Sequence, residues 1–409
     1  MNIVLEPGAA ALLDELHRAG FGAYAVGGCV RDSLLGLAPH DWDLCTAARP
    51  GQVMELFGED RCIPTGLQHG TVTVKQDGKL YEITTFRTEG RYSDGRHPDS
   101  VAFVPDLRED LARRDFTINA MAYSAEEGLC DPFGGREDLA RGVVRAVGEP
   151  LRRFGEDALR ILRLYRFAAR FGFAIDEATE AAAKQLASHL DCVSAERIEE
   201  ELNKLLAAPQ PGAYLEPEVL AFVLPELPPE ELTKARRRID ALPAGTEQVS
   251  ARWAALLLPL GETGARKALK RLKCSNARID GAAALVRECG EKTPDTLDKC
   301  DLRLQAKRLL GKYDLHTVQQ LTALWTALAP EEKASFDALR AEAEALTAQG
   351  ACCRISQLAV NGRDLMEAGA APGPGLRRVL EALLEEVITG RLPNEKTELL
   401  AFAAGFSAS

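Results

Sequence analysis

Residues 27–32 read Gly-Gly-Cys-Val-Arg-Asp, and residues 41–43 follow with Asp-Trp-Asp. Two glycines after a predicted strand let the backbone approach a ligand closely, and their N–H groups can point at a phosphate. A helix predicted to begin at Val30 would add its positive N-terminal end, and Arg31 would add a bidentate donor. We therefore expect Gly28 and Arg31 to bind phosphate, although a glycine pair alone often simply ends a strand.

The Asp-Trp-Asp run indicates a cation site. Residues two apart on a strand point to the same face, so Asp41 and Asp43 would be adjacent carboxylates. Two like charges this close are destabilising unless a cation lies between them, and hard oxygen ligands suit Mg²⁺. Such a pair is common in loops and turns, and glycosyltransferases also use one to hold a nucleotide-sugar through a metal. The preceding Gly-Gly turn and Arg31 make the combination more specific than either part.

The organisation of the chain predicts an α+β head. Strand-like segments are confined to the first third, at residues 24–27, 41–46, 71–75, 80–86 and 101–104. Asp77 and Gly78 predict a tight hairpin turn between the third and fourth of these. Helical patterns lie at residues 8–19, 30–36, 50–57 and 107–123. After Pro150 the pattern is almost entirely helical, so we expect a small mixed sheet with helices, followed by all-α regions.

Charge is unevenly distributed along the 409 residues. The net charge of −11 argues, taken alone, against a nucleic-acid partner. Residues 141–170 nevertheless hold eight arginines against Glu149, Glu156 and Asp157, and residues 263–279 hold six basic residues and no acid. Local clusters of this kind can bind phosphates, although solvated helix faces are the simpler interpretation.

Other features favour a cytoplasmic chain. No stretch of about 18 apolar residues predicts a transmembrane helix, so no membrane contact is expected. The first residues lack a basic segment followed by an apolar one, which makes export unexpected. The ten cysteines include no CxxC pair, so neither a structural zinc site nor a disulfide framework is indicated.

Residues 27–32, 34–36 and 41–43, together with Thr46, resemble the class II polymerase-β-like nucleotidyltransferases, the family of bacterial CCA-adding enzymes and poly(A) polymerases. The resemblance implies that Asp41 and Asp43 hold two Mg²⁺ ions. One ion would lower the pKa of an RNA 3′-hydroxyl for attack on the α-phosphate, and the other would stabilise the pyrophosphate. Glu82 is the candidate third carboxylate; the alternative is an exposed strand residue.

A second motif covers residues 113–121, Arg-Arg-Asp-Phe-Thr-Ile-Asn-Ala-Met. From spacing alone, Phe116, Ala120 and Tyr123 form a helical stripe. By resemblance, Asp115 organises the ribose side of the site and Arg114 contacts the nucleotide.

A third motif begins at Phe154 and contains Asp157 and Arg160, which would share one face of a helix. An ordinary ion pair is one interpretation. The other is a protein template, because cytosine and adenine both present an exocyclic amine beside an acceptor ring nitrogen. A carboxylate accepts from that amine and a guanidinium donates to the acceptor, whereas uracil and guanine face the carboxylate with a carbonyl oxygen.

The resemblance assigns the template role to this pair, and it matches Arg163 and Arg166 to further nucleotide-contacting positions. At about 100° per residue, Arg166 lies opposite Asp157 on an ideal helix, so we expect it to have a phosphate-binding or structural role. Residues 87–98 predict a mobile loop, and they resemble the flexible loop that CCA-adding enzymes use when switching from C to A addition.

The resemblance implies a head at residues 1–145, a helical neck at 146–210, a body at 211–345 and a tail at 346–409. The body and tail would grip tRNA through its phosphates. The expected reaction adds C, C and A to the 3′ end of tRNA from CTP and ATP, with Mg²⁺ and no obligatory protein partner. Alternatives are an A-adding tRNA nucleotidyltransferase, a poly(A) polymerase, or an RNA-binding module without catalysis.

Overall fold

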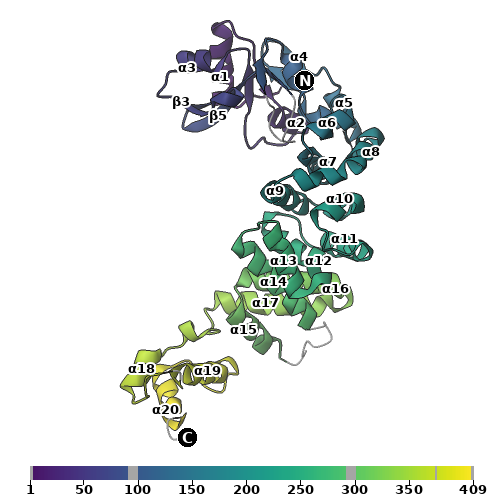
Figure 1. Cartoon of the computed structure of the whole chain (residues 1–409). Helices are drawn as coiled ribbons and strands as arrows, with labels where there is room; N and C mark the ends of the chain where they lie inside the picture. Colours follow the sequence, from purple (N-terminus) through teal and green to yellow (C-terminus); the bar gives the residue numbers. More distant parts are fainter. Residues whose placement is uncertain (1–2, 91–99, 292–300, 374, 407–409) are drawn as a thin grey trace. The chain divides into compact units, whose positions relative to one another are not determined.

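The computed structural model describes residues 3–90, 100–291, 301–373 and 375–406 (Figure 1). Contacts between residues divide the chain into two compact units, Met1–Pro225 and Glu226–Ser409. Within the described ranges, no helix is both long enough and apolar enough to cross a membrane.

The first unit contains the mixed sheet that the sequence predicts. Its strands run in the order β3-β4-β5-β2-β1-β8-β9. The bounds are β1 Ala23–Val26, β2 Leu44–Thr46, β3 Cys62–Gly66, β4 Thr71–Gln76, β5 Lys79–Thr85, β8 Ala122–Ser124 and β9 Gly128–Cys130. Strands β2 and β5 pair in parallel, and the other neighbours pair antiparallel.

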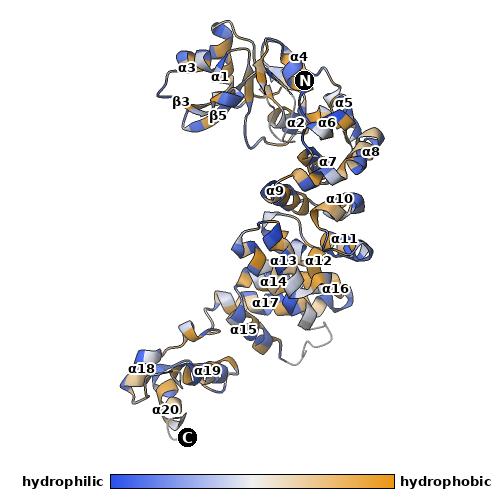
Figure 2. Cartoon of the chain, in the orientation of Figure 1, coloured by the Kyte–Doolittle hydropathy of each residue, from blue (hydrophilic) through white to orange (hydrophobic). Residues whose placement is uncertain are grey.

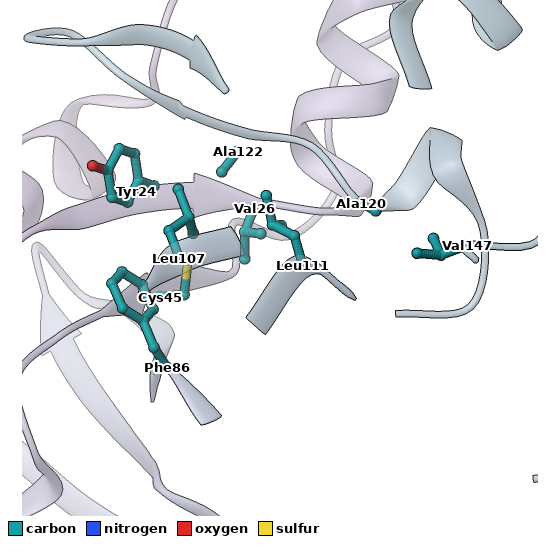
Figure 3. Packing of buried hydrophobic residues seen from close by; sticks show 9 residues of the cluster. All are labelled: Tyr24, Val26, Cys45, Phe86, Leu107, Leu111, Ala120, Ala122 and Val147. Atoms are coloured by element: carbon teal, nitrogen blue, oxygen red, sulfur yellow. The ribbon is translucent and has the colours of Figure 1, made fainter. Parts of the chain in front are cut away.

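Helices pack on this sheet and bury its apolar side chains. They are α1 Pro7–Arg18, α2 Gly28–Leu34, α3 Pro50–Phe57 and α4 Leu107–Ala112. Figure 3 shows one core cluster, in which Leu107 and Leu111 of α4 meet Val26 of β1 and Cys45 of β2. Burial of such side chains supplies the main stabilisation of the head.

The hairpin of β4 and β5 confirms the predicted turn. Asp77 and Gly78 both have positive φ, at 50° and 76°. A two-residue type I′ turn requires this conformation at both positions, and Asp-Gly tolerates it.

Three local predictions were wrong. The strand expected at residues 41–46 begins only at Leu44. The helix expected at 107–123 ends at Ala112, because the Asp115 carboxylate accepts hydrogen bonds from the backbone of Phe116 and the side chain of Asn119 and so closes a turn. The expected loop at 87–98 begins as a strand, β6 Arg87–Glu89, which pairs with β7 Val101–Phe103; residues 91–99 lie outside the described residues.

The rest of the first unit is mainly helical. Its elements are α5 Gly135–Arg141, β10 Val143–Val144, α6 Pro150–Glu156, α7 Leu159–Phe171, β11 Ala174–Ile175, α8 Glu177–Gln185, α9 Ala195–Leu206 and α10 Pro217–Val223. Helix α9 packs against α7 (Figure 1). This contact brings together charged side chains that belong to the candidate site described below.

The second unit is all-helical where it is described, as predicted. Its helices are α11 Leu232–Asp240, α12 Val249–Leu257, α13 Gly261–Arg271, α14 Asn276–Glu291, α15 Leu302–Lys312, α16 Leu315–Leu328, α17 Lys333–Ala348, α18 Gly362–Glu367, α19 Gly375–Ile388 and α20 Lys396–Phe406. Figure 2 shows hydrophilic and hydrophobic residues on the same helices, as expected when one face is buried. Leu365, Leu383 and Leu399 belong to a hydrophobic cluster near the C-terminal end.

Glu6 should make the stability of the head depend on pH. Its carboxylate caps α1 by accepting from the N–H groups of Gly8 and Ala9, and it also binds Lys79 and Tyr81. Burial alone would raise the pKa of Glu6, but these hydrogen bonds outweigh burial and lower the pKa to about 2. A lowered pKa means that the stabilisation is complete above the ordinary value of 4.5 and is lost as pH falls from there toward 2.

We expect Glu6→Gln to reduce the free energy of unfolding by about 1 kcal/mol at neutral pH, the usual value of a helix cap. The difference from wild type should shrink below the ordinary pKa of the carboxyl group. Urea unfolding of both proteins at neutral and acidic pH measures this difference in the free energy of unfolding. A deficit that stays constant on acidification would contradict the assignment.

Candidate active site

The site is framed by the turn between β1 and α2. Gly27 caps α2 with φ 77°, and its N–H donates to the Met121 carbonyl at 3.0 Å. A Cβ atom at Gly27 would lie 2.7 Å from Nη1 of Arg114. The positive φ favours glycine, and a Cβ here would also push the end of the Arg114 side chain away. Helix α2 therefore begins at Gly28, earlier than the predicted start at Val30.

Asp43 lies beside this turn, immediately before β2. The Val26 N–H donates to the Asp43 carbonyl at 3.0 Å, which ties this backbone to the end of β1. Asp41 is more open, with a side chain 82% exposed and His40 Nδ1 at 3.0 Å from its Oδ1. Neither aspartate belongs to a strand, so the predicted alternation on one strand face does not apply.

Electrostatics nevertheless connects these carboxylates. Loss of hydration to the surrounding protein raises the pKa of Asp43, Arg114 opposes the rise, and the charges of Glu82 and Asp41 add to it. Glu82 and Asp41 therefore each lie within electrostatic reach of Asp43. A bound cation would relieve their repulsion.

The donor chemistry fits a divalent cation. Asp41 and Asp43 offer only hard oxygen ligands, and Mg²⁺ is usually bound by one or two carboxylates while it retains several waters. In the described ranges, no three or more His, Cys, Asp or Glu side chains form a cluster that could hold a metal by themselves. Glu82 as a third ligand stays a prediction.

Arg114 has unused donor capacity next to Asp43. Its Nη2 lies 3.6 Å from Oδ2 of Asp110, and its buried Nε has no hydrogen-bond acceptor among the described residues. A buried donor without an acceptor is costly unless a ligand supplies one.

Arg31 has protein partners around its whole guanidinium group. It is buried, donates from Nε to Asp32 at 2.8 Å, and donates from Nη1 to the Asn119 side chain. Its guanidinium also lies about 5 Å from the ring centres of Phe167 and Phe171. This geometry favours a structural role for Arg31, joining α2 to α7.

Asp115 is the centre of a buried hydrogen-bond network. Its Oδ1 accepts from the backbone of Phe116 at 2.8 Å and from Asn119 at 3.0 Å. Its Oδ2 accepts from Arg163 Nε at 2.8 Å and lies 2.6 Å from Nη2. Burial would raise the pKa of Asp115, but Arg163 and Asn119 hold it well below its usual range.

Asp157 and Arg160 do not share one helix, which corrects the prediction. Helix α6 ends at Glu156, Asp157 has extended backbone, and α7 begins at Leu159. The Asp157 carboxylate accepts from the Leu159 N–H at 3.1 Å, which stabilises the break.

The two side chains are also bound to different partners. Asp157 Oδ2 accepts from Arg197 Nη2 at 2.7 Å, and its Oδ1 accepts from Nη1 at 3.3 Å. Arg160 donates from Nη1 to Glu156 at 2.9 Å and from Nη2 to the Arg113 carbonyl at 3.2 Å. The alternative interpretation, a direct ion pair between Asp157 and Arg160, is therefore not the arrangement found.

Arg163 and Arg166 differ in their surroundings. Arg163 contacts Asp115, whereas Arg166 is buried and forms an ion pair with Glu201 at 2.5 Å. The Arg166 guanidinium lies 3.9 Å from the ring centre of Phe167. These contacts fit the structural alternative for Arg166.

Sequence reasoning missed Asn119, Arg197 and Glu201. Asn119 lies within the recognised motif at residues 113–121, so its amide could have been considered as a bridge. Arg197 and Glu201 lie on α9, outside the three motifs that predicted the site. Only the packing of α9 on α7 shows that these two side chains point inward.

Family models match three parts of the chain. Residues 23–145 match the Poly A polymerase head domain, residues 172–228 match the probable RNA and SrmB-binding site of polymerase A, and residues 245–403 match the putative tRNA nucleotidyltransferase domain 2. Together with the mixed sheet and the paired aspartates, these matches define a nucleotidyltransferase.

Relatives that match nearly the whole chain indicate which kind of nucleotidyltransferase this is. The CCA-adding enzyme of Limosilactobacillus fermentum is 38% identical, covering 96% of this chain and 95% of its own length. That of Latilactobacillus sakei is 39% identical, covering 96% of each. The chain belongs to the CCA-adding enzyme family.

Solved structures agree in fold. The Bacillus stearothermophilus CCA-adding enzyme, solved in complex with CTP, is 34% identical with a TM-score of 0.81, covering 99% of this chain and 98% of its own. A Thermotoga maritima CCA-adding enzyme complexed with tRNA is 22% identical with a TM-score of 0.70, covering 98% and 96%, and shares the fold.

Proposed function

We propose that this chain adds C, C and A to the 3′ end of tRNA, using CTP and ATP. The observation that carries the proposal is the placement of Asp43 and Arg114 beside the Gly27 turn, with the charge of Asp41 acting on Asp43. This arrangement occurs in a chain that matches CCA-adding enzymes over nearly their whole length. The relatives crystallised with CTP and with tRNA are consistent with these substrates.

Asp41 and Asp43 would hold Mg²⁺. When bound, the metal supplies charge that activates the RNA 3′-hydroxyl and neutralises the pyrophosphate. Arg114, with its free Nε donor, would bind the nucleotide beside the aspartates. Gly28 would bring the backbone close to the phosphates, and Asp115 would hold Arg163 at the ribose side.

Asp157 and Arg160 would select the base. Both keep hydrogen-bonding capacity beyond their protein partners. The Asp157 carboxylate, with about four lone-pair sites, accepts three hydrogen bonds, from Leu159 and Arg197. Arg160 donates to Glu156 and to two backbone carbonyls, which leaves N–H groups for a base.

The second unit would bind the RNA backbone. The arginines of the basic segment are partly neutralised by acids that the fold brings to them: Arg266 pairs with Glu262 and Asp280, and Arg271 pairs with Glu226. The exposed lysines Lys267 and Lys270 are therefore the better candidates for phosphate contacts.

The division into head, neck, body and tail at residues 1–145, 146–210, 211–345 and 346–409 is part of the same proposal. A cytoplasmic location is also part of the proposal. All the cysteines that the structure describes are free, which suits a reducing compartment.

The decisive experiment supplies purified protein, Mg²⁺ and separate CTP or ATP to tRNA that ends before CCA, after CC, or with the complete end. We expect addition of C, C and then A, followed by arrest. Addition only to the CC-ended tRNA would indicate an A-adding enzyme, and long A tails would indicate a poly(A) polymerase. No incorporation on any substrate would contradict catalysis and favour an RNA-binding module.

A further inference from the structure

Helix α9 presents two opposite charges to the residues that would select the nucleotide. Arg197 and Glu201 are one turn apart, so they lie on the same face of the helix. Arg197 binds Asp157, whereas Glu201 is buried and contacts Arg166 at 2.5 Å and Arg163 at 3.7 Å. Helix α9 thus places Arg197 against the Asp157 carboxylate, and it places Glu201 against Arg163 and Arg166.

The contact between Arg197 and Asp157 matters because of where Asp157 lies. Its backbone is extended, between the end of α6 and the start of α7, so the regular geometry of a helix does not set its side-chain direction. The carboxylate is held by the Leu159 N–H on Oδ1 and by the Arg197 guanidinium on both oxygens. A planar guanidinium that contacts both oxygens fixes the plane of a carboxylate more tightly than a single hydrogen bond does.

The plane of this carboxylate decides what it can distinguish. An exocyclic amine donates along a lone pair, whereas a carbonyl oxygen at the same place repels it. If the carboxylate could rotate, an oxygen could turn away from the carbonyl of a wrong base, and the repulsion that rejects that base would fall. Selection then depends on the group that prevents rotation as well as on Asp157 itself.

We propose that Arg197 is a positioning residue for base selection, which fixes the carboxylate of Asp157 in the orientation that accepts C and A and rejects U and G. Glu201 supports the same face of α9 by holding Arg163 and Arg166. This inference rests on the proposed function, and it adds a residue outside the nucleotide-contacting set to the determinants of specificity.

The test compares incorporation of CTP and UTP into tRNA that lacks CCA, as the ratio of kcat/KM for the two nucleotides. We expect Arg197→Ala to lower this ratio about tenfold, equivalent to one well-aligned hydrogen bond. Arg197→Lys retains the charge but loses the planar guanidinium, so it should restore the ratio only in part. Circular dichroism and thermal unfolding establish that each variant is folded.

A double-mutant cycle separates positioning from general stability. If Arg197 acts through Asp157, then Arg197→Ala should change the ratio little once Asp157→Ala is present. Arg145→Ala is the matched control, because Arg145 forms an ion pair with Asp176 at 2.5 Å in the same unit. It should leave the ratio unchanged.

Three results would overturn the inference: a wild-type ratio in folded Arg197→Ala, an equal loss in Arg145→Ala, or additive effects in the cycle. A wild-type protein that incorporates no nucleotide would instead overturn the proposed function itself. The two failures are therefore distinguishable.

Discussion

Asp43→Ala should lower kcat/KM for nucleotide incorporation by about a thousandfold or more while tRNA binding is kept. The expectation follows from the raised pKa of Asp43. The surroundings of this carboxylate disfavour its negative charge, and a bound cation would offset that effect. Charge stabilisation by a catalytic metal is worth several kcal/mol, and about 1.4 kcal/mol corresponds to a factor of ten in rate. Asp43→Asn should lower kcat/KM by a similar factor, because it removes the charge of the side chain and preserves its shape.

Single-turnover incorporation and a tRNA-binding titration, run on the same preparations, measure the two properties separately. Asp14→Ala is the control, because Asp14 lies on the exposed face of α1 and pairs with Arg18 only at 4.0 Å. Turnover at the wild-type rate in Asp43→Ala would rule out the metal assignment. Loss of tRNA binding together with turnover would indicate a folding defect.

Asp115→Ala should reduce the free energy of unfolding of the first unit by about 3–5 kcal/mol, the usual cost of removing one partner from a buried ion pair. The substitution removes the carboxylate that accepts hydrogen bonds from the Arg163 guanidinium and from the side-chain amide of Asn119. It also removes the turn that places Phe116 in the core.

Urea unfolding followed by a probe in the first unit measures this loss. Glu137→Ala provides the comparison, because Glu137 forms an exposed ion pair with Arg141 within α5, and such pairs contribute about 1 kcal/mol at most. Equal effects of the two substitutions would contradict a central structural role for Asp115. Asp115→Asn should give an intermediate result, because the amide can still accept hydrogen bonds but carries no charge.

Local pattern was informative where neighbours in sequence determine the structure. The strand-like segments at 71–75 and 80–86, with Asp77 and Gly78 between them, predict a hairpin because both turn residues tolerate positive φ. The predicted helices at 8–19 and 50–57 were confirmed as α1 and α3. Pattern was misleading at residues 107–123, where the Asp115 side chain competes with the helical hydrogen bonds.

The candidate site shows the same difference between what local pattern predicts and what tertiary contacts decide. Asp41 and Asp43 were predicted from one motif and Arg114 from another, and the fold brings Asp43 and Arg114 beside the Gly27 turn. Arg31 was expected to meet a phosphate, but its guanidinium is occupied by Asp32 and Asn119. The spacing of a motif states which residues are close along the chain, and it does not state which partner each side chain will take.

The sequence by itself determined the family, the mixed head followed by helices, and the residue types at the site, because these depend on short-range spacing and hydrophobic periodicity. Only the tertiary structure decided the partners of the charged side chains. Asp157 meets Arg197, Asp115 meets Arg163, and acids from other segments neutralise the arginines of α13. The physical reason is that an ion pair forms where packing places two opposite charges close together, and that placement depends on contacts between residues far apart in the chain.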